Sequence, residues 1–319
     1  MYQHFYGLRE LPFELVSDPR YLYLSPGHRE ALSTLEYGLS AGKAVTVLIG
    51  EAGTGKTTLL NAALESDRCS QVRSICLTNP ALTRTEFVET LARRLALGAE
   101  AERSKARLIE ELERSLRETR ARGEITALIV DEAQALTTDL LEEIRLLANL
   151  EMGSCKLLPL LLIGQPSLGA RLETAAFRQL KQRVALRCET RPLTVNETAL
   201  YIKSRVEKAG GSPVRLFTRD AVRLIHEYSG GVPRTISAIS DNALLHGLAM
   251  GQQPVDGGLV FDACTDLALR PTQPSVRPLR LPDASPSQPF RADELTVKER
   301  RRVSLFDWKR WMANGRIRT

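Results

Sequence analysis

The sequence lacks long hydrophobic runs and is poor in cysteine. No stretch of its 319 residues approaches the ~20 apolar residues that cross a bilayer. The longest candidate, 157–163, has the length of a strand and contains Pro159. At the N-terminus, no charged segment precedes an apolar one, so we expect no secretory signal. The five cysteines are odd in number and lack metal-ligand spacing, which favours reduced thiols over disulfides or a zinc site. We therefore expect a cytoplasmic protein.

A broadly basic surface is also missing. The net charge is +6, but the residues from Thr265 onward hold 12 Lys/Arg against 6 Asp/Glu and so carry the whole excess. Residues 1–264 are balanced in charge. Because gripping nucleic acid through its phosphates needs clustered positive charge, we regard nucleic acid as the less favoured partner.

A glycine-rich segment indicates a phosphate-binding loop. It follows a short apolar run typical of a buried parallel strand and precedes leucines at helical spacing. Its glycines allow backbone N–H groups to turn toward a phosphate, while Lys56 reaches the β and γ phosphates and Thr57 ligates magnesium. The predicted nucleotide contacts are Gly50, Glu51, Ala52, Gly53, Thr54, Gly55, Lys56, Thr57 and Thr58. No Asn-Lys-x-Asp or Thr-Lys-x-Asp motif is present to read guanine, which favours ATP.

Apolar strands alternate with helices in the first part of the chain and give way to helices alone in the second. This order predicts an α/β fold with a parallel sheet covered by helices on both faces, then a small all-α lid domain. We expect domains at 1–192 and 193–252, a Pro-rich linker at 253–292, and a basic tail at 293–319. Predicted strands are 44–49, 72–77, 125–130, 157–163 and 184–188; predicted helices are 28–40, 85–97, 105–122, 139–150, 196–209, 220–229 and 233–250.

Two acids end the third predicted strand. Asp131 at the carboxyl end of that strand would lie beside Thr57 and hold Mg²⁺ through water. Glu132 would polarise a water for in-line attack on the γ phosphate. Adjacent carboxylates at a strand end are costly unless a cation and a water use them, so this pair predicts ATP hydrolysis and not binding alone.

Four further side chains are candidates because phosphoryl transfer is catalysed largely by positioned charge. Gln165 follows the fourth strand and would orient the attacking water beside Glu132. Arg178 and Arg183 precede the fifth strand, where one of them would reach a neighbouring subunit's γ phosphate. Arg234 lies in the first turn of a helix, an unfavourable place for a cation, which indicates a phosphate partner.

Several segments together resemble the AAA+ ATPases of the general secretion pathway protein A type. They are FYGLRELPFELVSDPRYLYL, GEAGTGKTTL, LIVDEAQAL, LIGQPSL, QLKQRVAL, RPLTVNETALYIKSRV and YSGGVPRTIS, and they cover roughly residues 1–250. The resemblance implies Walker A at 50–58, Walker B at Asp131 and Glu132, and sensor 1 at Gln165. It also implies an arginine finger at Arg178 or Arg183 and sensor 2 at Arg234.

The same resemblance bears on assembly and partners. It implies a homo-oligomer that forms on ATP, typically a ring, which powers or regulates a secretion, pilus or exopolysaccharide export machine. The lead segment would pack over the adenine through Phe5, Tyr6, Pro12, Phe13, Pro19 and Tyr23. The core is also similar to transposition-regulator ATPases that act on DNA, and this remains the alternative.

The tail departs from the secretion-type proteins, which continue into a membrane span and a peptidoglycan-binding domain. Here Trp308 and Trp311 are interleaved with basic residues, namely Lys298, Arg300, Arg301, Arg302, Lys309 and Arg310. This pattern suits a helix on an anionic membrane surface or a peptide docked in an acidic groove, and equally a disordered end without a partner. We expect the membrane version to attach the protein peripherally to the inner membrane.

Overall fold

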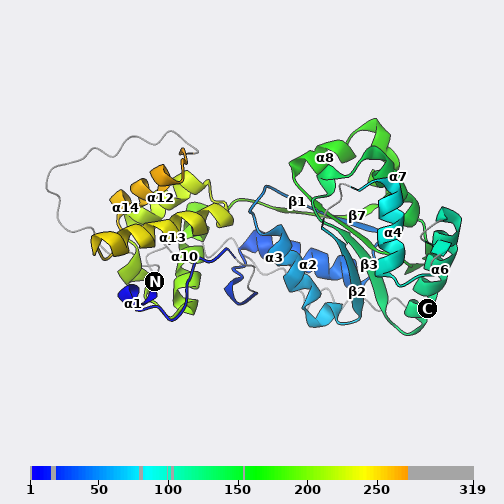
Figure 1. Cartoon of the computed structure of the whole chain (residues 1–319), viewed down its shortest axis with the longest axis horizontal. Coiled ribbons are helices and arrows are strands. Elements are labelled where there is room, and N and C mark those ends of the chain that lie inside the picture. The colour runs from blue at the N-terminus through cyan, green and yellow to red at the C-terminus, as the bar shows by residue number, and fades with distance from the viewer. Residues whose placement is uncertain are drawn as a thin grey trace, which may run out of the picture.

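The computed structural model describes residues 2–15, 19–78, 82–98, 100–101, 104–153 and 155–271. It has two parts, a sheet flanked by helices and a cluster of helices beside it (Figure 1). The linker after 271 and the basic tail therefore lie outside the described residues.

A five-stranded, wholly parallel sheet forms the first part. The strand order is β2-β3-β6-β1-β7. Parallel pairing places all five carboxyl ends on one edge, where ligands bind in open α/β sheets. The strands are β1 (Val45–Gly50), β2 (Val72–Leu77), β3 (Ile125–Val130), β6 (Leu160–Gly164) and β7 (Val184–Thr190), and the hairpin strands are β4 (Glu151–Met152) and β5 (Cys155–Lys156).

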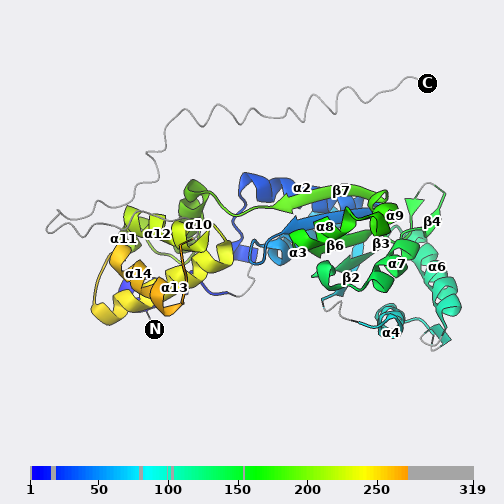
Figure 2. The same ribbon diagram turned by 90° about the horizontal axis from the view of Figure 1, so that it is seen from above.

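Different helices cover the two faces of the sheet (Figures 1 and 2), and alternating strand residues are buried against them. Val47, Leu128 and Leu162 belong to the core under α4, α6, α7, α8 and α9, whereas Leu48 and Ile129 pack against α2 and α3. The helices are α2 (Pro26–Ser40), α3 (Lys56–Leu64), α4 (Arg84–Arg94), α6 (Lys105–Ala121), α7 (Thr138–Leu147), α8 (Pro166–Leu172) and α9 (Arg178–Lys181). Short 3₁₀ turns occupy Pro19–Tyr21, Asp67–Cys69, Ala133–Ala135 and Ala175–Phe177. The predicted α/β architecture is confirmed.

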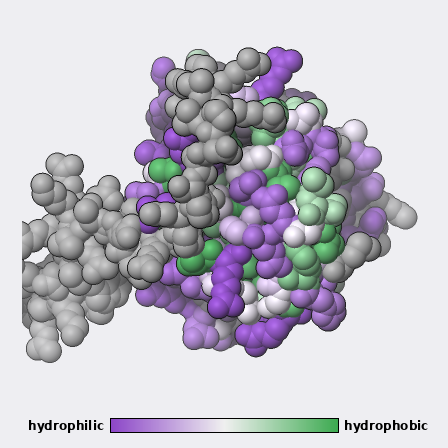
Figure 3. Space-filling model, turned by 90° about the vertical axis from the view of Figure 1, so that its left-hand side faces the viewer, coloured by the Kyte–Doolittle hydropathy of each residue, from purple (hydrophilic) through white to green (hydrophobic). Residues whose placement is uncertain are grey.

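The second part is helical. It contains α10 (Val195–Lys208), α11 (Pro213–Leu216), α12 (Arg219–Ser229), α13 (Pro233–Met250) and α14 (Gly257–Asp266). On the face seen in Figure 3, hydrophobic residues lie in small groups among hydrophilic ones. Helix α10 begins with a capping box in which the Thr194 side chain and Glu197 satisfy each other's backbone N–H groups.

The predicted start of the Pro-rich linker at 253 is wrong, because α14 follows it. The Asp256 side chain accepts from the Leu259 N–H and caps this helix, whose Leu259, Val260, Ala263 and Cys264 are buried against α12 and α13. Pro254 and the glycines at 257 and 258 gave the segment a linker-like composition. Burial of an apolar face overrides that weak local preference.

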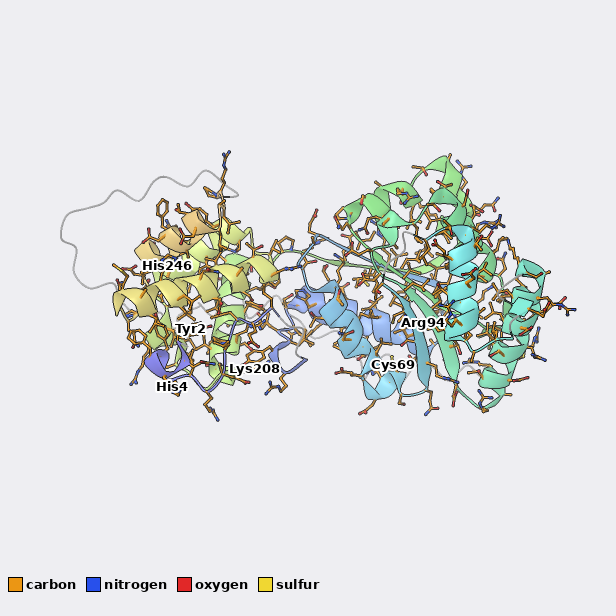
Figure 4. The ribbon with its side chains drawn as sticks, in the orientation of Figure 1. Tyr2, His4, Cys69, Arg94, Lys208 and His246 are labelled. Atoms are coloured by element: carbon orange, nitrogen blue, oxygen red, sulfur yellow. The ribbon has the colours of Figure 1, made fainter. Side chains whose placement is uncertain are left out.

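The N-terminal lead packs into the helical part although it is far away in sequence. Helix α1 (Gln3–Tyr6) and the following turn bury Tyr2, Tyr6 and Phe13 in the core formed by α10 to α14. The Tyr2 hydroxyl donates to Asp241 on α13, and Figure 4 shows Tyr2 within this part. Lys208 Nζ donates to the Leu22 carbonyl at 3.2 Å, close to the junction with the sheet part (Figure 4).

Across the described ranges, no helix combines the length and the apolar character needed to cross a bilayer.

Candidate nucleotide site

A cavity of about 340 Å³ opens at the carboxyl edge of the sheet. Its walls come from the lead segment, the loop after β1 with the start of α3, Glu132 after β3, helix α10 and the first turns of α13. Of the residues predicted to bind phosphate, it is lined by Ala52, Gly53, Gly55, Lys56, Thr57 and Thr58, together with Glu132 and Arg234. Segments far apart in sequence therefore meet in one place.

The Lys56 side chain is held by backbone carbonyl groups of the loop. Its Nζ donates to the Gly50 carbonyl at 2.8 Å and to the Glu51 carbonyl at 3.0 Å. Burial lowers the pKa of Lys56, while the carboxylates of Glu132, Asp131 and Glu51 act in the opposite direction. An anionic ligand would favour the charged form of the Lys56 ammonium, so the site favours the binding of a negatively charged group.

Gly53 brings the loop and the helical part into contact. Its φ of +79° is a left-handed conformation, and a Cβ here would lie 3.0 Å from Arg234 Cβ and from Val232 Cγ1. The Arg234 N–H donates to the Gly53 carbonyl at 3.3 Å. Contact this close brings the Arg234 side chain to the cavity wall, as its position at the start of α13 predicted.

The two acids after β3 differ in what they touch. Thr57 Oγ1 donates to Asp131 Oδ2 at 3.2 Å, which joins the two predicted magnesium ligands. A hydroxyl and a carboxylate are the oxygen ligands that suit Mg²⁺. Glu132 has a φ of +52°, unusual for a residue with a side chain, and it lines the cavity. Its Oε2 accepts from Gln165 Nε2 at 3.4 Å, so the predicted neighbours Glu132 and Gln165 are together.

Arg178 and Arg183 do not belong to this group. Arg178 begins the short α9 and is exposed, and Arg183 follows α9 just before β7. Neither lines the cavity of its own chain. An arginine that acts on a neighbouring subunit's nucleotide would be placed in this way.

Two residues of the site were not anticipated from the sequence, namely Gln134, which contacts Glu132, and Arg205, which lines the cavity. Gln134 contacts both Glu132 and Gln165, and its position two residues after Glu132 is the one signal that could have pointed to it. Arg205 on α10 is 9% exposed and donates to the carbonyl oxygens of Pro12 and Glu14 and to the Tyr201 hydroxyl. Nothing in the local sequence distinguishes Arg205 from other arginines of an amphipathic helix.

Arg205 also holds the part of the cavity wall where the lead residues were expected to pack over the adenine. Its guanidinium lies 4.9 Å from the Tyr21 ring centroid and 5.4 Å from that of Tyr201, within reach of cation–π attraction. Tyr21 lines the cavity, whereas Tyr6 and Phe13 are buried in the helical core and lie away from it. The expectation that Tyr6 and Phe13 pack over the adenine is therefore wrong, and Tyr21 has the suitable position.

Arg205→Met should destabilise the protein and weaken nucleotide binding. The substitution leaves two buried carbonyl groups and a phenol without their charged donor, which lowers the free energy of unfolding by about 3 kcal/mol. Urea unfolding measures this change. The matched control is Arg223→Met, since Arg223 is 61% exposed and pairs with Glu227 on the surface, and it should change stability by about 0.5 kcal/mol or less. Equal effects of the two substitutions would contradict the role given to Arg205.

Comparison with known proteins agrees with this geometry. The family model described as an AAA domain matches residues 40–172, which contain β1, the phosphate loop, β3 and β6. The chain is an AAA-domain protein. General secretion pathway protein A from Aeromonas hydrophila is 36% identical over 258 residues, which is 81% of this chain and 47% of that protein. The chain thus spans about half the length of the curated relative that it matches.

Solved structures share the fold at low identity. The Aeropyrum pernix ORC2 protein, described in complexes with ADPNP and ADP, is 17% identical with a TM-score of 0.57, covering 82% of this chain and 72% of that one. The Cdc6p protein of Pyrobaculum aerophilum is 19% identical with a TM-score of 0.58, covering 79% and 71%. At this identity the likeness establishes the AAA fold alone, with its parallel sheet and following helical region. An AAA domain implies nucleotide binding.

Proposed function

We propose that the protein binds ATP with Mg²⁺ at the cavity on the carboxyl edge of the sheet and hydrolyses it. The observation that carries this proposal is the convergence of Lys56, Thr57, Asp131 and Glu132, with Thr57 and Asp131 in direct contact. ATP binding without hydrolysis would need only the phosphate loop and the metal ligands. The second carboxylate, one residue beyond Asp131, supplies a base for water.

Each side chain has a distinct task in this proposal. Lys56 and the loop N–H groups bind the β and γ phosphates, and Thr57 and Asp131 hold the metal, which neutralises charge on the phosphates when bound. Glu132 takes the proton of the attacking water, and Gln165 orients that water. Arg234 brings a cation from the helical part to the phosphates, so that bound ATP would hold the two parts together.

We propose further that the active site is completed by a second copy of the chain. Arg178 and Arg183 lie outside their own cavity, so a role at the γ phosphate requires a neighbour. Arg183 is the better placed candidate in sequence, since it directly precedes β7. ATP would then favour the oligomer because it is bound from both sides of the interface.

A mixing experiment tests the shared site. Arg183→Ala should bind ATP normally but hydrolyse it at least ~100-fold more slowly, because the cation that stabilises the transition state is lost. Adding Glu132→Gln protein should restore part of the phosphate release, since each variant supplies what the other lacks. Arg191→Ala is the matched control, because Arg191 is 85% exposed beyond β7, and it should hydrolyse at the parental rate. If Arg183→Ala retains full activity and Arg178→Ala does too, the shared site is rejected.

The relationship to general secretion pathway protein A supports a role in powering or regulating a secretion or export machine. The balanced charge of residues 1–264 gives the DNA-regulator alternative no comparable support. Copurification of partners with Glu132→Gln protein loaded with ATP, compared with Lys56→Ala protein, tests the assignment. Envelope or export components enriched by the first variant support it, and DNA retained with that variant favours the alternative.

A further inference from the structure

Gln134 lies between the two residues that the proposed hydrolysis assigns to the attacking water. It belongs to the 3₁₀ turn Ala133–Ala135 that follows Glu132. Its Nε2 donates to Glu132 Oε2, and its Oε1 accepts from the Gln165 N–H at 3.0 Å. One amide therefore joins the carboxyl end of β3 to the carboxyl end of β6.

The direction of this amide follows from chemistry. The Gln165 main-chain nitrogen can only donate, and the ionised Glu132 carboxylate can only accept. Turning the Gln134 amide over would place N–H against N–H and oxygen against carboxylate. A glutamine suits the position because it carries one acceptor and one donor group on the same planar end.

The surrounding chain leaves room for this side chain and fixes its backbone. A Cβ on Gly164 would lie 2.7 Å from Gln134 Oε1, so the glycine at the end of β6 makes space for the amide. Arg171 on α8 donates to the Gln134 carbonyl at 2.8 Å and to the Leu136 carbonyl at 2.7 Å. Both the side chain and the backbone of Gln134 are thus tied to the segment that carries Gln165.

We propose that Gln134 is a positioning residue, which fixes the Glu132 carboxylate and the Gln165 segment relative to each other for activation of water. The inference rests on the proposed function. Both amides, from Gln134 and from Gln165, donate to Oε2 of Glu132 and so hold the carboxylate in one orientation. Without Gln134, the Glu132 side chain turns about its own bonds and spends less time in the productive geometry.

Gln134→Glu tests this role with a change of nearly the same shape. It removes the donor to Glu132 and puts a second carboxyl group beside the first. We expect kcat for phosphate release to fall about 10- to 100-fold, with KM for ATP within about twofold of the parent.

A second variant and a control separate positioning from folding. Gln134→Met keeps the length without hydrogen bonds, and it should lose the same factor in kcat with KM for ATP within about twofold of the parent. Gln71→Glu is the matched control, because Gln71 is exposed at the opposite edge of the sheet, just before β2, and it should behave as the parent. Parental kcat in both Gln134 variants overturns the inference if Glu132→Gln is inactive. If Glu132→Gln is itself active, the proposed function fails, because Glu132 is then not the base.

Discussion

Replacing Lys56 by alanine is expected to abolish nucleotide binding. The Lys56 Nζ is enclosed by the loop, where it donates to the carbonyls of Gly50 and Glu51, and the Lys56 side chain is buried in the cavity wall. Without it, a triphosphate would meet the carboxylates of Asp131 and Glu132 without the cation of the phosphate loop. Because charge–charge contacts gain strength away from water, we expect ATP affinity to fall at least ~100-fold, a change of ~3 kcal/mol. Equilibrium titration with a fluorescent ATP analogue measures it.

Lys43→Ala is the control for this titration. Lys43 lies just before β1, at the end of the strand opposite the loop, and its ammonium is 5.0 Å from the Tyr37 ring centroid. The substitution removes the same charge without touching the cavity and should leave ATP affinity unchanged. Parental affinity in Lys56→Ala, or equal loss in both variants, would show that the loop is not the phosphate site.

Glu132→Gln is expected to have the second large effect. It should slow hydrolysis and leave ATP binding intact, whereas Lys56→Ala removes binding itself. The amide keeps the size of the side chain but cannot take a proton, so binding persists while hydrolysis falls by ~10²- to 10⁴-fold. Single-turnover assays on the purified variant should show ATP bound and unhydrolysed over many parental turnover times. Glu151→Gln, on the exposed β4–β5 hairpin, is the control and should turn over normally. A Glu132→Gln rate within a few-fold of the parent would mean that another group activates the water.

The centre of the sheet was predictable because its inner strands, β1, β3 and β6, are buried on both faces. The predicted strand at 125–130 coincides with β3, since a continuous apolar run bounded by polar residues leaves little choice. The edge strand β2 also coincides with its predicted range, 72–77, although Arg73 and Ser74 are exposed. The fourth strand starts at Leu160 and not at 157, because Leu157 and Leu158 are buried in the approach to the strand and the Pro159 carbonyl pairs with the Leu128 N–H. Apolar character alone does not separate a buried loop from a strand.

The parts of the site that follow a strand could be predicted for a similar reason. Thr57, Asp131 and Gln165 are next to the carboxyl ends of parallel strands, and parallel pairing brings those ends together. Gln134 and Arg205 could not be predicted in this way. Their partners are chosen by the 3₁₀ turn after β3 and by the packing of the lead on α10, neither of which has a periodic signal. Helix α14 was missed because its burial depends on α12 and α13, not on its own composition.

The most direct test of the account is phosphate release from Mg·ATP by the purified chain, measured beside Glu132→Gln and Lys56→Ala over a range of protein concentrations. We predict magnesium-dependent release by the parent that rises per subunit with concentration, and none above background in either variant. Titration should find ATP bound to Glu132→Gln and not to Lys56→Ala. Release that is equal in the parent and in Glu132→Gln, or a parent that binds no ATP, would contradict the assignment of this cavity as a site of ATP hydrolysis.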